Sequence, residues 1–88
     1  MAVYVVTYDL NNETNRPPIT DEFDTTAYAR LSESCYAIET DESPEEVFAR
    51  FKEHLDPDDT LFVVTLSAPW TGFGLKEVID WMTTALGS

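Results

Sequence analysis

Residues 2–10 read Ala-Val-Tyr-Val-Val-Thr-Tyr-Asp-Leu, and this stretch decides the fold. Its residues up to Tyr8 are apolar, aromatic or β-branched almost without interruption, which predicts a β-strand buried on both faces. Because alternate side chains point to opposite faces, something must cover each side of this strand. The strand delivers one carboxylate, Asp9, to its C-terminal end.

Three further strands are predicted. Residues 61–66, Leu-Phe-Val-Val-Thr-Leu, form the only other stretch apolar enough for the middle of a sheet, so we expect this run centrally, beside the first strand. Tyr28–Leu31 and Ser34–Thr40 predict a tight hairpin across Ser32 and Glu33, placed toward the edges because its strands are less apolar.

Three helices are predicted between and after these strands. The first begins at Pro18 or Thr20 and runs to about Ala27, after a turn-rich surface loop over residues 11–18. The second begins with the capping box Ser43-Pro-Glu-Glu46. The apolar residues expected to pack from it are Val47, Phe48, Phe51 and Leu55. The third runs from Leu75 to about Leu86 and ends at Gly87-Ser88.

The predicted order is strand, helix, strand, strand, helix, strand, helix, within a single domain over residues 1–88. Two right-handed β-α-β units in this order indicate the α+β class and a ferredoxin-like sandwich, an antiparallel sheet with helices on one face. We expect the first and fourth strands at its centre. The opposite face then needs either the last helix or a second subunit to cover it, and we expect a homodimer.

Charge narrows the classes of partner. Seventeen acidic residues against five basic ones give a net charge of −12. The five basic residues are scattered along the sequence, so tight non-specific nucleic-acid binding is not expected. The acidity fits a solvated surface, and it also fits docking on a basic protein or imitation of DNA.

Hydropathy and local patterns indicate a cytoplasmic protein without a membrane span or secretory signal. The one cysteine, Cys35, is expected to be a buried strand residue, since a single cysteine forms no disulfide within the chain. The one histidine, His54, is expected near the C-terminal end of the second helix, where the helix dipole favours it.

Asp9 is the candidate catalytic and metal-binding residue. It ends a central strand, where open sheets place ligands, next to a loop that supplies Asn11 and Arg16 as candidate binding residues. Trp70 and Phe73, in the loop before the last helix, are the other predicted binding residues. The sequence requires no cofactor, but two Asp9 carboxylates meeting at a dimer axis would suit Mg²⁺ or Mn²⁺. The alternative for Asp9 is a side chain that only ends the strand in a turn.

The chain resembles the small CRISPR-associated adaptation subunit and its VapD-like and SinR-like relatives. The residues that carry this resemblance are Val-Tyr-Val-Val-Thr-Tyr-Asp-Leu-Asn at 3–11, the hairpin pattern from Tyr28 to Thr40, and Asp58 followed by Leu-Phe-Val-Val at 61–64. The resemblance implies a ferredoxin-like homodimer tied to defence systems or mobile elements. It also implies, for some members, a strand-end aspartate that helps bind a metal for nuclease work, and Asp9 matches that position.

Two functions are therefore predicted from different classes. The first is an acidic, homodimeric interaction protein related to these defence or mobile-element proteins and without catalytic turnover. The alternative is a metal-dependent endonuclease acting on RNA or DNA through Asp9 of each subunit. The scarcity of basic residues favours the first, because a polyanionic substrate needs cationic groups to hold its phosphates.

Overall fold

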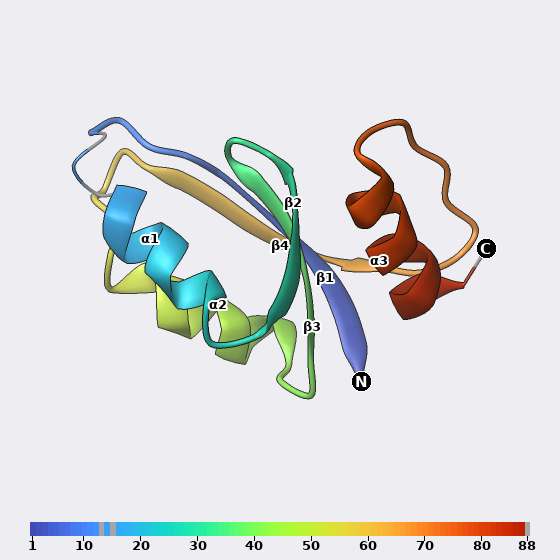
Figure 1. Cartoon of the computed structure of the whole chain (residues 1–88). Helices are drawn as coiled ribbons and strands as arrows, with labels where there is room; N and C mark the ends of the chain where they lie inside the picture. The colour runs from blue at the N-terminus through green and yellow to red at the C-terminus, as the bar shows by residue number, and fades with distance from the viewer. Residues whose placement is uncertain (13, 15, 88) are drawn as a thin grey trace.

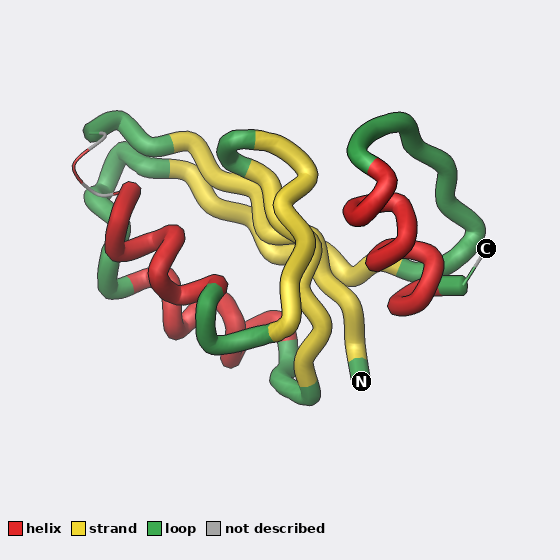
Figure 2. Tube along the Cα trace, viewed as in Figure 1, coloured by secondary structure: helices red, strands yellow, loops and turns green. Residues whose placement is uncertain are grey.

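A computed structural model describes residues 1–12, 14 and 16–87. Four strands form one sheet, two helices pack on one of its faces, and a third helix lies on the far side of the sheet (Figure 1). Figure 2 shows the same arrangement by secondary structure. The elements are β1 (Ala2–Asp9), α1 (Arg16–Phe23), β2 (Ala27–Ser32), β3 (Cys35–Thr40), α2 (Pro44–Lys52), β4 (Thr60–Leu66) and α3 (Lys76–Leu86).

The predicted ferredoxin-like fold is confirmed, with the order β-α-β-β-α-β-α and a fully antiparallel sheet. The predicted position of the fourth strand is wrong. The strands lie in the order β2-β3-β1-β4, so β3 shares the centre with β1, and β4 is an edge strand. The reason is that each β-α-β crossover skips one strand, and the skipped space is filled by the strand of the other unit.

The main core lies between the sheet and the pair α1 and α2. Every second side chain of β1 enters it, beginning with Tyr4. The Phe23 ring stacks on Tyr36 with centroids 3.9 Å apart and meets Phe51 at 4.9 Å, so one aromatic group joins α1, β3 and α2. The buried members of this core are Tyr4, Val6, Tyr8, Leu10, Ile19, Phe23, Tyr36, Ile38, Val47 and Phe51.

The second helix begins as predicted. The Ser43 hydroxyl accepts a hydrogen bond from the Glu46 backbone N–H at 3.1 Å, and the Glu46 carboxylate accepts one from the Ser43 N–H at 3.0 Å. Two backbone donors at the helix start are thereby satisfied, which is how a capping box fixes the first turn. Of the predicted packing residues, Val47 and Phe51 are fully buried, but Phe48 is 37% exposed. It faces the groove beside β4 rather than the core.

The first helix begins and ends earlier than predicted. It starts at Arg16, so Pro17 and Pro18 occupy its first turn, where the missing proline N–H groups cost nothing. It ends at Phe23, and the backbone N–H groups of the next three residues turn back onto residues 21–23. Within the loop predicted before this helix, Glu13 and Asn15 lie outside the described residues, and so does Ser88 at the predicted end of α3.

The third helix covers only part of the second sheet face, where it contacts β2. Under it Ala29 and Ala37 are buried, and Met82 of the helix is 9% exposed. Toward β4 the same face is open, because Phe62 is 61% exposed and Val64 49% exposed. Within one copy of the chain, α3 therefore leaves the β4 side of this face uncovered, and the expected second subunit stays a prediction. None of the helices over the described residues is long and apolar enough to cross a membrane.

Candidate functional site

Asp9 is the exposed last residue of β1, opposite Thr60 of β4 in the strand register. Because side chains alternate along a strand, Asp9 lies on the same face of the sheet as Val5 and Thr7, away from the main core. The carboxylate that organises this end of the sheet belongs to a different residue. Asp59 accepts the backbone N–H of Asn11 through Oδ1 at 2.8 Å and the backbone N–H of residue 56 through Oδ2 at 2.8 Å.

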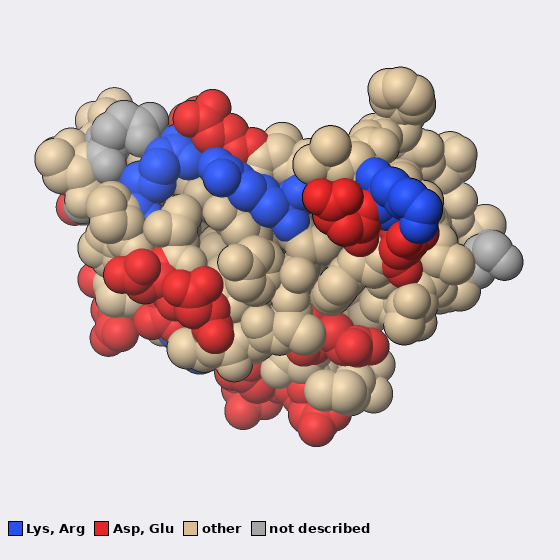
Figure 3. Space-filling view, in the orientation of Figure 1, with Lys and Arg blue, Asp and Glu red and all other residues tan. Residues whose placement is uncertain are grey.

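Arg16 points into the hairpin turn between β2 and β3. Its Nη1 donates to the Glu33 carbonyl at 2.9 Å and lies 3.4 Å from the Tyr8 hydroxyl, with the guanidinium 5.6 Å from the centre of the Tyr8 ring. Arg30 donates to the same Glu33 carbonyl at 3.2 Å. Two of the five basic residues therefore meet, although the sequence scatters them. Figure 3 shows this basic surface as a blue band among acidic groups.

Trp70 and Phe73 lie at the other end of the molecule, in the loop that leads into α3 (Figure 1). The Trp70 indole N–H donates to the Gly87 carbonyl at 2.6 Å, and Gly87, with φ of 78°, ends the helix. Trp70 therefore joins the loop to the end of α3. Phe73 projects fully into solvent. This loop, α3 and residues of β2 line a cavity of about 380 Å³ with mostly apolar walls.

The predicted binding residues thus do not form one site. Asn11 and Arg16 belong to the end of the sheet where β1 stops, whereas Trp70 and Phe73 belong to the α3 side. Nothing in the residue order could have shown this separation, because the distance between them is set by how α3 returns over the sheet.

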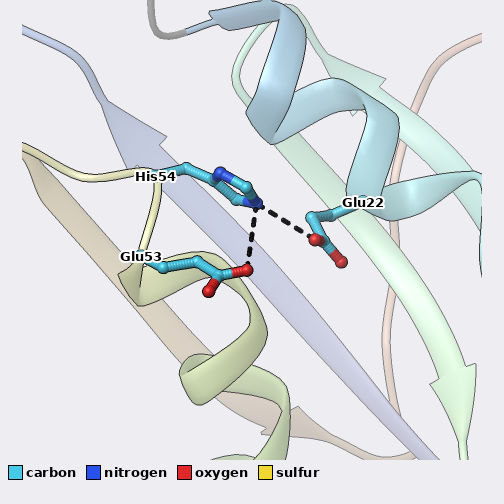
Figure 4. A group of neighbouring side chains, drawn as sticks. All are labelled: Glu22, Glu53 and His54. Atoms are coloured by element: carbon cyan, nitrogen blue, oxygen red, sulfur yellow. Dashed lines mark hydrogen bonds and ion pairs between the residues drawn. The ribbon is translucent and has the colours of Figure 1, made fainter.

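The structure brings together three side chains that the sequence does not connect. His54 Nε2 lies 3.0 Å from Oε1 of Glu22 and 3.8 Å from Oε1 of Glu53 (Figure 4). One donor atom from each of the three lies within 4.8 Å of the others. Glu22 comes from α1, whereas Glu53 and His54 follow directly after α2. His54 is therefore not merely a residue near a helix end, because it links two helices.

Arg50 holds the other oxygen of Glu22. Its Nη1 lies 3.6 Å from Glu22 Oε2 and donates to the Thr25 hydroxyl at 2.6 Å. Its Nη2 lies 3.0 Å from Glu42 Oε1, a charge contact that lacks hydrogen-bond geometry. Because the side chains of Arg50 and Glu22 are only 24% and 21% exposed, their ion pair is less screened than one at the surface. Glu22 is thus oriented with Oε1 facing His54.

Cys35 is half-buried in β3, next to Thr7 on the partly open face. Burial raises the pKa of its thiol, and a hydrogen bond with Thr7 lowers it by a smaller amount. The thiol is therefore protonated at neutral pH and is a poor nucleophile.

Comparisons with known proteins bear on the fold alone. No family model and no curated protein matches the chain. The chain is similar to the crystal structure of a hypothetical protein, TT1823, from Thermus thermophilus, with a TM-score of 0.70 and 20% sequence identity. The match covers 84% of this chain and 92% of that one.

Proposed function

We propose that this chain is a non-catalytic interaction protein that works as a homodimer, joined through β4, with its acidic surface free for a basic protein. The observation that carries the proposal is the uncharged, apolar edge strand β4 in a chain of net charge −12. We also propose that this chain is related to the CRISPR-associated adaptation subunit and the VapD-like proteins. The identity of the neighbouring genes would test that kinship.

The two edges of the sheet differ in the features that discourage pairing. The outer strand β2 contains Arg30, has an irregular register between Arg30 and Ser32, and contacts α3. Charges, bulges and covering elements all block the addition of another strand. The seven residues of β4 contain no charge, proline or glycine. Its outer edge therefore offers backbone groups to a second extended strand.

A second copy of β4 suits this edge by its side-chain pattern. In an antiparallel pair centred on Val63, Phe62 of each copy lies opposite Val64 of the other on the open face of the sheet. These two apolar side chains are the exposed ones of that face, at 61% and 49%. On the opposite face, Val63 meets its own copy beside Phe48, which borders the groove of about 290 Å³ along β4.

The area available suggests a dimer of moderate affinity. An aromatic side chain buries about 150–250 Å², so hiding the exposed 61% of Phe62 contributes about 3 kcal/mol per copy at about 25 cal/mol per Å². Two copies give about 6 kcal/mol, which is within the range of about 4–15 kcal/mol that association costs. Val64 and the new backbone hydrogen bonds must supply the surplus. We therefore expect a dimer whose population depends on concentration in the micromolar range.

Sedimentation equilibrium tests the β4 interface with two matched variants. Phe62→Lys and Phe73→Lys make the same chemical change at two exposed phenylalanines, so they alter the net charge equally. We expect the wild type and Phe73→Lys to dimerise alike and Phe62→Lys to be monomeric. A monomeric wild type at high micromolar concentration would refute the proposal, and so would a dimer unaffected by Phe62→Lys.

A basic partner is the second part of the proposal. Acidic groups form several separate clusters on the face that Figure 3 shows, and the sequence has 17 acidic residues against only 5 basic ones. A cationic peptide probe should bind with an affinity that falls steeply as salt rises, whereas duplex DNA should show no submicromolar binding near physiological salt. Tight DNA binding at that salt concentration would contradict this part.

The endonuclease alternative needs a different dimer. In the β4 pair, the two Asp9 side chains belong to opposite ends of the joined sheet, about 25 Å apart from the strand spacing and rise, too far for one shared ion. Cleavage of labelled RNA and DNA with Mg²⁺ or Mn²⁺ separates the two functions. Robust wild-type cleavage that Asp9→Asn abolishes would overturn the interaction hypothesis in favour of the nuclease.

A further inference from the structure

We infer that Glu22, Glu53 and His54 form a binding site for a divalent first-row transition metal ion, of which Zn²⁺ is the representative, and that this ion ties α1 to the end of α2. The site is separate from β4 and from Asp9. It is independent of the proposed dimer.

The spacing of the three donor atoms fits a shared ion. Zinc binds histidine nitrogen and carboxylate oxygen at about 2.0–2.2 Å, so two ligands of a tetrahedral ion lie about 3.3 Å apart. The distances from His54 Nε2 to the Glu22 and Glu53 oxygens, 3.0 and 3.8 Å, bracket this value. The Glu22 and Glu53 oxygens lie within 4.8 Å of each other, and the Glu53 side chain, 74% exposed, can move to complete the geometry. Figure 4 shows the imidazole edge directed at both carboxylates.

Charge favours a divalent cation at this place. The carboxylates of Glu22 and Glu53 carry −2, and Arg50 does not change this sum because its charge is shared with Glu42, 3.0 Å from Nη2. A divalent ion neutralises that charge. Arg50 does not fill the site, because its guanidinium lies against Oε2 of Glu22 while Oε1 faces His54. Arg50 instead orients the ligand from behind, as supporting residues do at many metal sites.

The donor set and its exposure indicate which ion fits. An imidazole ligand favours zinc and similar transition metals over Mg²⁺ and Ca²⁺, which prefer oxygen alone. The side chains of Glu22 and His54 are 21% and 25% exposed and so are held by their surroundings, whereas Glu53 is 74% exposed. An ion can therefore enter from solvent and keep a fourth position for water.

Calorimetric titration of the untagged chain with ZnCl₂ tests the site. We expect one saturable site per chain, with no comparable binding of MgCl₂. Glu53→Gln and His54→Gln should each weaken Zn²⁺ binding. Loss of a residue that only supports a metal ligand typically costs roughly 10- to 100-fold in affinity, and loss of a ligand itself should cost at least as much. Zn²⁺ should also raise the thermal unfolding midpoint of the wild type but not that of His54→Gln.

Two variants control for other causes. Glu45→Gln removes the same charge from an exposed position at the start of α2, and Cys35→Ser removes the only thiol. Both should bind Zn²⁺ like the wild type. Absence of saturable binding would overturn the inference. Equal losses in Glu45→Gln and Glu53→Gln would assign the effect to general charge, and loss in Cys35→Ser would assign it to the thiol; either result would also overturn it.

Discussion

Replacement of Phe51 by alanine should remove much of the folding free energy of this domain. The side chain is fully buried, and its ring meets that of Phe23 at 4.9 Å, where α1, α2 and the sheet converge. Truncating a buried phenylalanine to alanine costs about 3–5 kcal/mol, because the apolar contacts are lost and a cavity remains. At about 0.05–0.15 kcal/mol per residue, a chain of 88 residues has only about 4–13 kcal/mol in total.

Urea unfolding followed by circular dichroism measures this loss, with protein concentration fixed so that self-association contributes equally. Phe73→Ala is the matched control, because it makes the same chemical change at a fully exposed side chain. We expect the control to stay within about 0.5 kcal/mol of the wild type. The description of the core would be refuted if Phe51→Ala lost no more stability than Phe73→Ala. Phe51→Leu, a milder change, keeps the comparison measurable if the alanine variant does not fold.

Three further predictions concern single groups. Ser43→Ala should lower the unfolding free energy by about 1 kcal/mol, measured by urea titration, because the helix N-cap is lost; no change would show that the capping box is not formed in solution. Hydrogen bonds from Ser43 hold the pKa of Glu46 below its usual value, so the stability from this group is present at neutral pH and lost as pH falls below about 4.3. Glu46→Gln should therefore flatten the fall in thermal midpoint on acidification, and an unchanged acid profile would argue against it. Burial raises the pKa of the Cys35 thiol. The protonated thiol therefore contributes to folding stability at neutral pH, and this contribution is lost as pH rises above the ordinary thiol pKa of about 8.5. Alkylation of Cys35 near neutral pH should be much slower in the native chain than in urea, and equal rates would contradict its burial.

Local sequence patterns predicted most of the helices and strands, because these elements are determined by residues that lie close together in the sequence. The capping box at Ser43 and the hairpin across Glu33 are of this kind. The prediction that β4 lies at the centre of the sheet was wrong for a physical reason. Its apolar side chains indicate burial, but they do not indicate what buries them. Phe62 and Val64 are exposed within one copy of the chain. Apolarity alone does not distinguish a strand covered by its own chain from one left at an edge.

The candidate metal site had no signal in the sequence. Glu22 and His54 are 32 positions apart, and only the packing of α1 beside α2 brings their side chains to 3.0 Å. The meeting of Arg16 and Arg30 at the Glu33 carbonyl has the same origin. Neither contact can be predicted before the arrangement of helices and strands in space is known, because the ionisable residues follow no helical or strand periodicity along the sequence.

In the proposed β4 dimer, the unequal edges of the sheet limit how far the assembly can grow. A sheet with two receptive edges has a valence of two and can polymerise into an open fibre, as unprotected edge strands do. In the proposed dimer, the irregular register of β2 discourages pairing at that edge, so β4 is the edge that accepts a neighbour. A chain with a valence of one stops at a closed pair. We therefore expect the irregular register of β2 to protect the proposed dimer against open-ended growth at high concentration.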